Sequence, residues 1–544
     1  MRVLCTFLAV FVIVGGTVVS AQTPNTPIQH VIIVIQENRT PDNLFHEDKP
    51  LIKNGAHVMP PNDVGSCLGK NVPMRPTVLN VCFDLGHYHD PSWLDQYDNG
   101  LMDGACRVMI YPGKCIKLPS TVPALAQYTY VTDGDHLVDP YFQIAEQYGF
   151  ANWMFGTNQG PSFNAHLFLF AGTSAPEAYD PNDLNKYYQW FSAENTVISK
   201  TTGCTAADTA IALEVNPSGV ELPGFDRGYP CYDIPTLASV LDKAQISWKY
   251  YAENPYQIWT SPNTIASICG PAHSTVCSGD EWDNNVVSGP NGPGQVITDI
   301  NSCNLAGVSW VTPDGVWSDH PGSYFGTNDG GPSWVASIVN AVGGSPCNYW
   351  SNTAVFVLWD DWGGFYDDVV PYGCGPGLPC GYSNGTGKAY VYGFRVPFLV
   401  VSAYTKYTSH PKGQPYVGYV SGASGEVAPY IHDFGSMLNF IEYAFGTDGH
   451  PLGWPNPGIS PDYPYADQLA PDVYPTCSSQ QLCPYGLADF FDFTQQPRTF
   501  YKITGAKYPT KCFVNPKDCF RRFFPQEPDN ELEEDPLSDK YLDD

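Results

Sequence analysis

The stretch His30-Val-Ile-Ile-Val-Ile-Gln36 is apolar and β-branched through its centre, and it ends in Glu37-Asn38-Arg39. Two further runs have the same uninterrupted apolar character, Ala354-Val-Phe-Val-Leu-Trp359 and Val396-Pro-Phe-Leu-Val-Val401. Continuous rather than alternating apolarity is typical of strands that are covered on both faces, as in a parallel sheet. We therefore predict that these three runs are strands of one buried sheet.

Helical periodicity lies between and after these runs, over residues 141–147, 333–342 and 436–445. This mixture predicts an α/β domain in which helices cover both faces of a mostly parallel central sheet. The 51 glycines and 50 prolines are spread along the chain and predict many long, loop-rich insertions. Residues 176–300 are rich in Asn, Tyr, Pro and Gly, and we predict a cap or insertion there within a domain spanning 22–524.

The two ends of the chain differ in composition from the rest. Met1-Arg2, an apolar run from Leu4 to Val14 and the small residues Val19-Ser20-Ala21 are typical of a secretory signal peptide. We expect residues 1–21 to be removed and the protein to be exported, either periplasmic or secreted. Residues 525–544 are strongly acidic and predict a disordered tail. No later apolar stretch reaches the roughly 18 residues of a spanning helix, so we expect no transmembrane segment.

The cysteines support this location. Of the 17 cysteines, Cys5 lies in the predicted signal, and the even number that remains favours disulfide bonds in an exported protein. Connectivity does not follow from spacing, but short separations favour local loops. The pairs that we predict are Cys67–Cys82, Cys106–Cys115, Cys269–Cys277, Cys374–Cys380, Cys477–Cys483 and Cys512–Cys519.

The charge of the chain is unbalanced, with 26 basic and 55 acidic side chains and a formal net charge of −29. Such a surface repels nucleic acid, so we expect no nucleic-acid partner. It leaves a small anionic substrate possible, because a bound metal ion dominates the charge within a site. The sequence carries no signal for the oligomeric state.

Acidic side chains follow two of the apolar runs, Glu37 after the first and Asp360-Asp361 after the second. Ligands of open α/β sheets bind at the carboxyl ends of the strands, and both acids fall there. Adjacent carboxylates repel each other unless a cation neutralises them. The pattern therefore favours a metal site, although two solvated strand ends would look the same.

A third motif, Gly160-Pro161-Ser162, combines a turn with the start of an apolar helical stretch. Ser162 is a good helix N-cap, and the N–H groups and dipole there stabilise phosphate or an ionised hydroxyl. His166 comes four residues later and is expected on the same helix face. An ordinary helix cap remains the alternative. Two histidine loops, Asp84-Leu-Gly-His87 and Ser318-Asp319-His320-Pro321, give a weaker functional indication.

In these residues the chain resembles the bacterial phosphoesterase family that holds non-specific phospholipases C and acid phosphatases, within the alkaline phosphatase-like superfamily. The resemblance implies an alkaline phosphatase-like fold. Each motif is weak alone, but all of them occur in the order of the family. They are His30 to Arg39, the His87 loop with Met102-Asp103-Gly104, Gly160-Pro161-Ser162, Ser318 to Pro321, Trp359 to Asp367, Gly393 to Pro397, Gly435 to Glu442 and Phe491 to Phe493.

The resemblance also implies roles for matching positions. Glu37, Asp360 and Asp361 correspond to ligands of one divalent metal ion, for which Ca, Zn, Mg and Mn all remain possible. Asn38 corresponds to a ligand or a phosphate contact, and Ser162 to a nucleophile that also touches the metal. His87 and His320 match catalytic histidines of the pocket. His166 stands where many members have arginine, and we expect it to contact the substrate or to act in catalysis.

Two family histidines are absent from this chain. Many members have Asp-His-Val where this sequence has Asp367-Asp368-Val369, and many have Asp-His-Thr-Ser where it has Asp433-Phe434-Gly435-Ser436. These departures bear on the identity of the metal and on any second metal site.

The hypothesis from sequence is an exported, metal-dependent phosphoesterase of the acid phosphatase or phospholipase C type. It would hydrolyse phosphate mono- or diesters through a phosphoserine, with a small phosphate ester or a phospholipid headgroup as substrate. The alternative is a catalytically inactive exported binding or surface protein that retains the fold. Hydrolysis of sulfate or phosphonate esters is a third possibility, because one fold serves several chemistries.

Overall fold

The computed structural model describes most of the chain between its two ends. The predicted signal peptide, residues 1–21, and the predicted tail, residues 525–544, lie outside the described residues. The described residues are 23–59, 63–112, 122–173, 191–196, 201–215, 219–221, 228–289, 291–313, 315–322, 329–377, 380, 391–423, 425, 430–452, 486–516 and 519.

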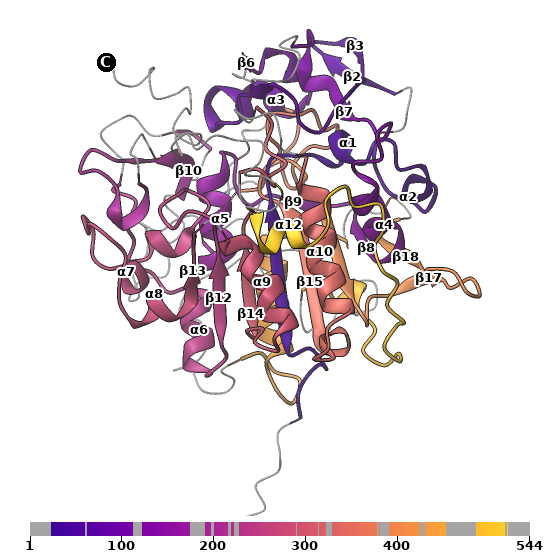
Figure 1. The fold of residues 1–544 in the computed structure, drawn as a ribbon. Helices are drawn as coiled ribbons and strands as arrows, with labels where there is room; N and C mark the ends of the chain where they lie inside the picture. The colour runs from indigo at the N-terminus through magenta and orange to yellow at the C-terminus, as the bar shows by residue number, and fades with distance from the viewer. Residues whose placement is uncertain are drawn as a thin grey trace, which may run out of the picture.

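A nine-stranded sheet in the order β13-β12-β14-β1-β15-β16-β8-β18-β17 forms the centre of the molecule (Figure 1). The strands from β13 to β15 are mutually parallel, and β8 is parallel to β18. The central strand β1 is buried from its second residue onward because it pairs on both sides. The strands are β1 (His30–Gln36), β8 (Gly149–Ala151), β12 (Trp248–Tyr251), β13 (Val286–Val287), β14 (Val308–Val311), β15 (Thr353–Trp359), β16 (Phe398–Ser402), β17 (Tyr407–Ser409) and β18 (Val417–Ser421).

All three apolar runs are buried strands, namely β1, β15 and β16, but β16 is antiparallel to β15. A parallel pair needs a crossover connection, usually a helix. The described residues between Trp359 and Phe398 contain no helix, and the chain returns in the opposite direction. The uninterrupted apolarity of the third run therefore reports burial on both faces, and it does not report strand direction.

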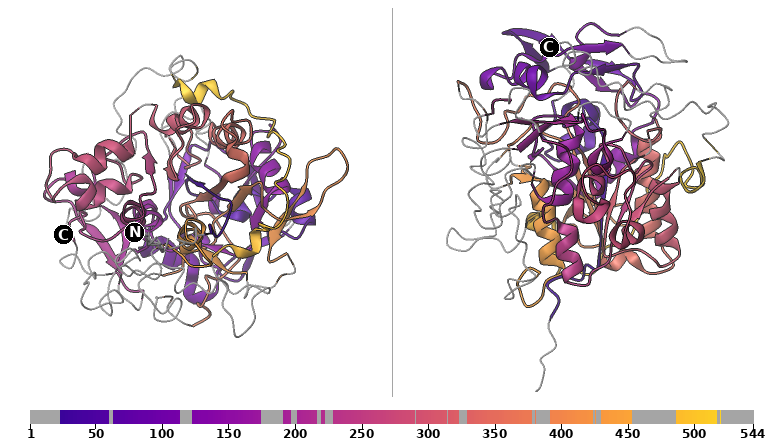
Figure 2. Two further views of the ribbon diagram at one scale, coloured as in Figure 1. Left: turned by 90° about the horizontal axis from the view of Figure 1, so that it is seen from below. Right: turned by 90° about the vertical axis from the view of Figure 1, so that its left-hand side faces the viewer.

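Helices cover both faces of the sheet, as Figures 1 and 2 show. The helix α10 contacts both α4 and α9, all three contact strands of one face, and α12 packs on α9. The helices α5, α6 and α11 form the second layer, in which α5 contacts both of the others. This arrangement confirms the predicted α/β class and its mostly parallel sheet. The bounds are α4 (Asp139–Gln147), α5 (Ser162–Ala171), α6 (Leu237–Lys243), α9 (Gly292–Asn301), α10 (Gly331–Gly343), α11 (Phe434–Ala444) and α12 (Lys511–Val514).

Residues 63–112 lie above the carboxyl ends of the parallel strands (Figure 1). We call this segment the cap; it is distinct from the cap or insertion predicted at residues 176–300. Two antiparallel strand pairs build the cap, together with a short helix: β2 (Val64–Cys67) with β3 (Lys70–Pro73), β5 (Phe83–Leu85) with β6 (Ile110–Pro112), and α3 (Leu94–Tyr97). Small apolar clusters hold the cap, separate from the main core. No helix in the described residues is long and apolar enough to cross a bilayer.

The second half of the predicted 176–300 insertion belongs to the central layers. It supplies β12 and β13 to the sheet and contributes α6 and most of α9 to the two helical layers. We therefore propose that an insertion, as a separate unit, is confined to residues before Leu237, where the described residues include the two-stranded pair β10 (Phe191–Thr196) and β11 (Ala212–Val215).

The disulfide bonds agree only in part with the prediction. Cys269–Cys277, Cys374–Cys380 and Cys512–Cys519 are present, and Cys477 and Cys483 lie outside the described residues. The predicted pairs Cys67–Cys82 and Cys106–Cys115 are wrong, because Cys67 bonds to Cys106. The turn after β2 lies against the loop that precedes Cys106, a proximity that sequence spacing does not reveal. Two unpredicted bonds are Cys204–Cys231 and Cys303–Cys347.

Candidate active site

The carboxyl end of β1 places Glu37 and Asn38 inside the molecule, where both are fully buried. Asn38 has a positive φ of 59°, which turns the chain sharply after the strand. Its backbone N–H donates to Oδ1 of Asp360 at 3.1 Å. Gly363 packs on this turn with φ +60°, and a Cβ at Gly363 would lie 2.6 Å from the Cβ of Asn38. The turn therefore requires glycine at position 363.

The adjacent strand β15 places Asp360 and Asp361 at the same edge of the sheet. Oδ1 of Asp360 also accepts from the N–H of Asp361 at 2.8 Å, and Oδ1 of Asp361 accepts from Gly363 at 2.7 Å. Burial raises the pKa of the Asp361 carboxyl well above its ordinary value, and the charge of Asp360 adds to this rise. Two adjacent carboxyl groups in a buried position require a compensating positive charge if both are to ionise.

The helix α5 brings the third part of the site. Oγ of Ser162 donates to Oε2 of Glu37 at 3.0 Å, and Nε2 of His166 lies 2.9 Å from Oε1 of the same carboxyl group. Nε2 of His166 is also 3.7 Å from Oδ2 of Asp360. Ser162 and His166 thus share one helix face, as the spacing predicts. The expected N-cap is wrong by one residue: Ser162 is the first residue of α5, Pro161 is the N-cap, and the serine hydroxyl bonds Glu37 instead of the helix backbone.

Burial controls the protonation of this group. The pKa of Glu37 is raised well above its ordinary value by desolvation and then by the charges of Asp360 and Asp361, while the bond from Ser162 opposes the rise. Desolvation lowers the pKa of His166 to about 4, against the attraction of Asp360. His166 is therefore a neutral imidazole at neutral pH, which is the form that can donate a lone pair to a metal ion.

The residues fit a divalent cation. One ligand atom from each of Glu37, His166 and Asp360 lies within 4.8 Å of the others. Within the described part of the chain, three further observations point the same way: Oδ2 of Asp360, Oδ2 of Asp361 and Oδ1 of Asn38 are buried and have no hydrogen-bond partner. Oxygen atoms of this kind accept a hard cation, and an imidazole nitrogen is a common ligand of Zn²⁺ and related ions. The sequence predicts that His166 contacts the substrate or acts in catalysis, and it does not predict this position beside the carboxylates.

His87 and His320 enter from two different loops above the carboxylates. Nδ1 of His87 lies 2.7 Å from the carbonyl of Leu85, and its Nε2 lies 3.1 Å from Nδ2 of Asn38. The two imidazole rings are 5.6 Å apart. Burial lowers the pKa of both histidines, and Asp360 opposes this effect in each case. The structure therefore brings both predicted histidines to the carboxylate group.

A buried network that sequence reasoning missed holds the His320 loop. The carboxylate of Asp319 accepts from the hydroxyl of Tyr141 at 2.8 Å and from Nε1 of Trp359 at 3.0 Å. Nη2 of Arg39 donates to the Asp319 carbonyl at 2.6 Å. Burial raises the pKa of Asp319 to about 7. These contacts join the ends of β1 and β15 to the loop, so they position His320.

The two segments that lack the family's histidines do not join this group. Asp368, which stands at the first missing histidine, lies 3.4 Å from Nη2 of Arg395, and the aspartates before the two departing positions have partners of their own. Asp367 pairs with the buried Arg395, whose Nε lies 3.1 Å from Oδ1 of Asp367 and whose Nη2 lies 3.6 Å from Oδ1 of Asp42. The Arg395 guanidinium thus compensates the negative charge of Asp367 and Asp42. Asp433 caps α11 by accepting from Ser436, and it receives the Tyr392 hydroxyl at 2.9 Å. A further group of Asp133, His136 and Asp139 lies toward the surface.

Comparisons with known proteins match most of the chain to one family. The model of the Phosphoesterase family matches residues 28–448. The non-hemolytic phospholipase C of Burkholderia pseudomallei is 25% identical over 477 residues, covering 79% of this chain and 56% of that protein. The hemolytic phospholipase C of Pseudomonas aeruginosa is 22% identical over 438 residues, covering 77% of this chain and 53% of that protein. The chain thus spans about half the length of these curated relatives.

Similarity to solved structures is low. The lipoteichoic acid synthase LtaP of Listeria monocytogenes gives a TM-score of 0.29 at 8% identity, with 79% of this chain and 74% of that chain covered. We draw no conclusion about function from a likeness of this size.

Proposed function

The chain belongs to the Phosphoesterase family, and from this we propose that it is a metal-dependent hydrolase of phosphate mono- or diesters with Ser162 as its nucleophile. The relatives named as phospholipases C support phosphate esters over sulfate or phosphonate esters. A soluble phosphate ester or a phospholipid headgroup is the proposed substrate.

One observation carries the proposal. Ser162 stands at the N-terminus of α5 with its hydroxyl 3.0 Å from Glu37, within a buried set of acids and histidines. A helix N-terminus attracts the phosphoryl group, because its first N–H groups have no partner within the helix. Glu37 accepts a hydrogen bond from the Ser162 hydroxyl, and this bond orients the serine oxygen so that its lone pairs can attack phosphorus. A serine that served only as a helix cap would bond the backbone of its own helix instead.

Glu37, Asp360 and His166 would hold the cation, with Asp361 and Asn38 beside them. A bound divalent cation would lower the pKa of the serine hydroxyl and withdraw charge from the phosphoryl oxygens.

The proposed reaction proceeds in two steps, and residues of the chain act in each. The Ser162 hydroxyl transfers its proton to Glu37 as its oxygen attacks phosphorus and forms a new P–O bond. The bond to the leaving oxygen breaks, and a phosphoseryl enzyme results. His320 protonates the leaving oxygen; His87 is less suited because its Nε2 already contacts the Asn38 amide. Water then attacks the same phosphorus from the side that the leaving group occupied and transfers one proton to His320. The P–O bond to Ser162 breaks, and Glu37 returns its proton to the serine oxygen. Positioning and electrostatic stabilisation supply most of the acceleration.

Export is part of the proposal. Six disulfide bonds lie within the described residues, and disulfides persist in oxidising compartments. The predicted signal peptide points in the same direction. A periplasmic or secreted location therefore suits the chain.

The experiment is a set of initial rates for the purified protein with each of Ca²⁺, Zn²⁺, Mg²⁺ and Mn²⁺, on an aryl phosphate, a phosphocholine ester and an aryl sulfate. We expect turnover of a phosphate ester that a chelator abolishes and one of these metals restores. Metal binding without turnover of any ester would instead support the inactive binding protein that retains the fold.

A further inference from the structure

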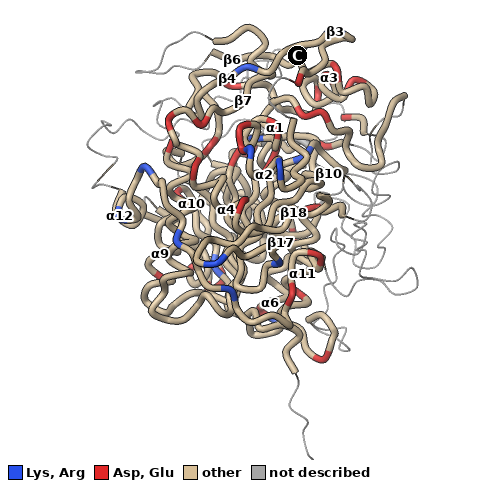
Figure 3. Tube along the Cα trace, turned by 90° about the vertical axis from the view of Figure 1, so that its right-hand side faces the viewer, with Lys and Arg blue, Asp and Glu red and all other residues tan. Residues whose placement is uncertain are grey.

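A second acidic group lies beside α4 and α2 (Lys49–Lys53), on the side of the molecule that Figure 3 shows. Oδ2 of Asp133 and Oδ2 of Asp139 lie 3.8 Å and 3.4 Å from Nδ1 of His136. One ligand atom from each of the three residues lies within 4.8 Å of the others. Two oxygens bound to one Ca²⁺ at about 2.4 Å can be at most about 4.8 Å apart. The two carboxyl groups are therefore close enough to share one ion.

The segment that leads into α2 closes this group on its inner side. Oε2 of Glu47 accepts from the backbone N–H of Asp133 at 2.8 Å and from the hydroxyl of Thr132 at 3.2 Å. The next residue, Asp48, is only 1% exposed, and its Oδ1 accepts from the N–H of Leu51 at 2.9 Å as the N-cap of α2. Its Oδ2 is buried and has no hydrogen-bond partner, and the same holds for Oδ1 of Asp133. Two buried carboxyl oxygens are thus free to accept a cation.

Negative charge in this group lacks a fixed positive partner. Burial raises the pKa of Asp133 to about 6, and the charge of Asp139 adds to the rise. Burial raises the pKa of Asp48 as well, and Glu146 and Asp133 add to that effect. Within the described residues, no lysine or arginine forms an ion pair with any of these acids, and the ion-pair partner that they have is His136, which is 76% exposed. A cation from solution would remove this repulsion.

A comparison with the group of Asp42, Asp367 and Asp368 shows what is different here. Those three acids also bring ligand atoms within 4.8 Å of one another. The guanidinium of Arg395 lies among them, at 3.1 Å from Asp367 and 3.4 Å from Asp368. The protein thus neutralises that group with its own side chain, whereas the group beside α4 is left to an ion from solution.

The ligand set favours calcium among the divalent ions. Ca²⁺ binds about six to eight oxygen atoms, waters among them, in a flexible geometry, whereas Mg²⁺ requires a near-ideal octahedron. The side chains of Asp133 and Asp139 are 24% and 30% exposed, so waters can complete the shell. Zn²⁺ prefers nitrogen and sulfur ligands, and the single imidazole here is largely exposed. Carboxyl oxygens therefore dominate the group.

We propose that Asp133 and Asp139, together with the buried Oδ2 of Asp48, bind one calcium ion at a site separate from the active site. The ion joins the start of α2 to the loop before α4 and to α4 itself, and a proton holds its place on Asp48 when calcium is absent. The helix α4 also carries Tyr141, whose hydroxyl donates to Asp319 at 2.8 Å. Calcium therefore stabilises the helix that supports the His320 loop.

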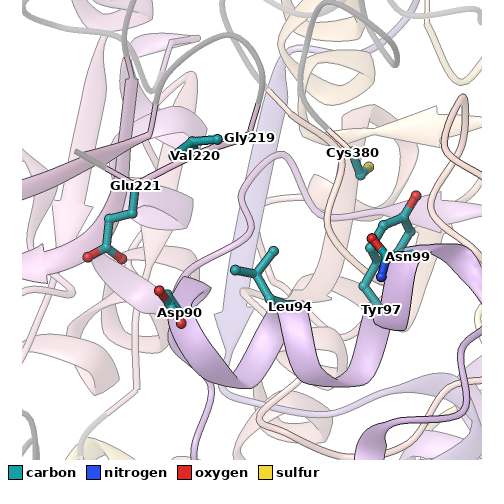
Figure 4. Close-up of a pocket in the computed structure, with 8 residues that line it drawn as sticks. All are labelled: Asp90, Leu94, Tyr97, Asn99, Gly219, Val220, Glu221 and Cys380. Carbon is teal, nitrogen blue, oxygen red and sulfur yellow. The ribbon is translucent and has the colours of Figure 1, made fainter. Parts of the chain in front are cut away.

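The test is calorimetric titration of Ca²⁺ into the Glu37→Gln protein, in which the active-site acids are disabled. We expect one ion to bind per chain and, at about 10 mM, to raise the melting temperature by about 2 °C or more. Adding Asp133→Asn with Asp139→Asn should weaken this binding about tenfold or more, because amides keep the shape but lack the charge. The control is Asp90→Asn, at an exposed acid of the cavity between α3 and residues 219–221 (Figure 4), and it should bind calcium unchanged.

A second variant guards against loss of the fold. Asp48→Asn keeps the N-cap bond to Leu51 and should also weaken calcium binding about tenfold. Unchanged binding in this variant would overturn the role of Asp48. Absence of calcium binding by the Glu37→Gln protein at about 10 mM would overturn the whole proposal, as would an equal loss in Asp90→Asn. Binding of Zn²⁺ but not Ca²⁺, removed by His136→Ala, would overturn the choice of calcium.

Discussion

The hydroxyl of Ser162 donates to the carboxyl group of Glu37 across 3.0 Å, and the two residues are 125 positions apart in the chain. Ser162 begins a helix, and Glu37 directly follows the central strand of the sheet. His166 contacts the other oxygen of the same carboxyl group. Glu37 thus receives the proposed nucleophile and a neutral imidazole from one helix face, and it faces Asp360 on the neighbouring strand.

Glu37→Gln should reduce metal affinity about tenfold or more, because an amide keeps the shape of the side chain but lacks its charge. Metal content and calorimetric titration of the purified variant measure this loss. Glu281→Gln, at an exposed position, is the control and should bind metal as the parent does. Full metal content in the Glu37 variant would place the ion elsewhere.

Gly363→Ala should lower both thermal stability and metal affinity. The new Cβ would lie 2.6 Å from the Cβ of Asn38, and the residue has φ +60°. Gly413→Ala is a matched control, because Gly413 has φ +73° but nothing within 4 Å of the added atom. Both variants incur the strain of a positive φ, on the order of 1 kcal/mol. Only the first should lose metal, and equal losses in both would show that the Asn38 turn tolerates the methyl group.

His320→Asn should slow esters with poor leaving groups far more than para-nitrophenyl phosphate, because an activated phenol leaves without a proton. A general acid contributes about 10² to 10⁴ in rate. The measurement is the dependence of kcat on leaving-group pKa, with His273→Asn at the exposed surface as control. A uniform loss across all leaving groups would assign His320 a positioning role instead.

Asp48 gives a prediction on stability that is independent of the active site. Burial raises its pKa from 3.8 to about 9, with Glu146 and Asp133 adding to the effect of desolvation. The folded state therefore holds a proton that the unfolded state releases, and the free energy of unfolding falls as pH rises from about 4 to 9. Asp48→Asn keeps the cap bond to the N–H of Leu51 and removes this titration.

The variant should match the parent in melting temperature near pH 4 and exceed it by on the order of 2 °C or more at pH 8. Thermal unfolding across this pH range, with the exposed Asp208→Asn as control, measures the difference. Parallel curves for parent and Asp48→Asn would show that Asp48 is ionised in the folded protein.

The local sequence pattern is sufficient to predict the strands whose carboxyl ends carry the candidate site. The apolar runs identified β1 and β15, and their terminal acids identified Glu37 and Asp360, because burial and strand ends are both visible in sequence. The four-residue spacing likewise placed Ser162 and His166 on one face. These inferences need only the periodicity of helices and strands and the position of acids relative to them.

The sequence pattern does not show which segments far apart in the chain lie close together in the fold. The direction of β16, the bond between Cys67 and Cys106, and the pairing of Asp367 with Arg395 all depend on which distant segments meet. The sequence shows Arg395 only as part of the Gly393 to Pro397 motif. That its guanidinium neutralises the acids near the first missing histidine is visible only in the folded structure.

The central claim is that Ser162 is the nucleophile of a metal-dependent phosphoesterase, and the direct measurement is kcat on an aryl phosphate for metal-loaded Ser162→Ala. The control is Ser337→Ala, a buried helical serine that bonds the carbonyl of Ser333. The account predicts that Ser162→Ala folds, retains its metal and loses about 10³-fold or more in kcat, whereas Ser337→Ala stays close to the parent. A kcat within tenfold of the parent for Ser162→Ala would contradict it.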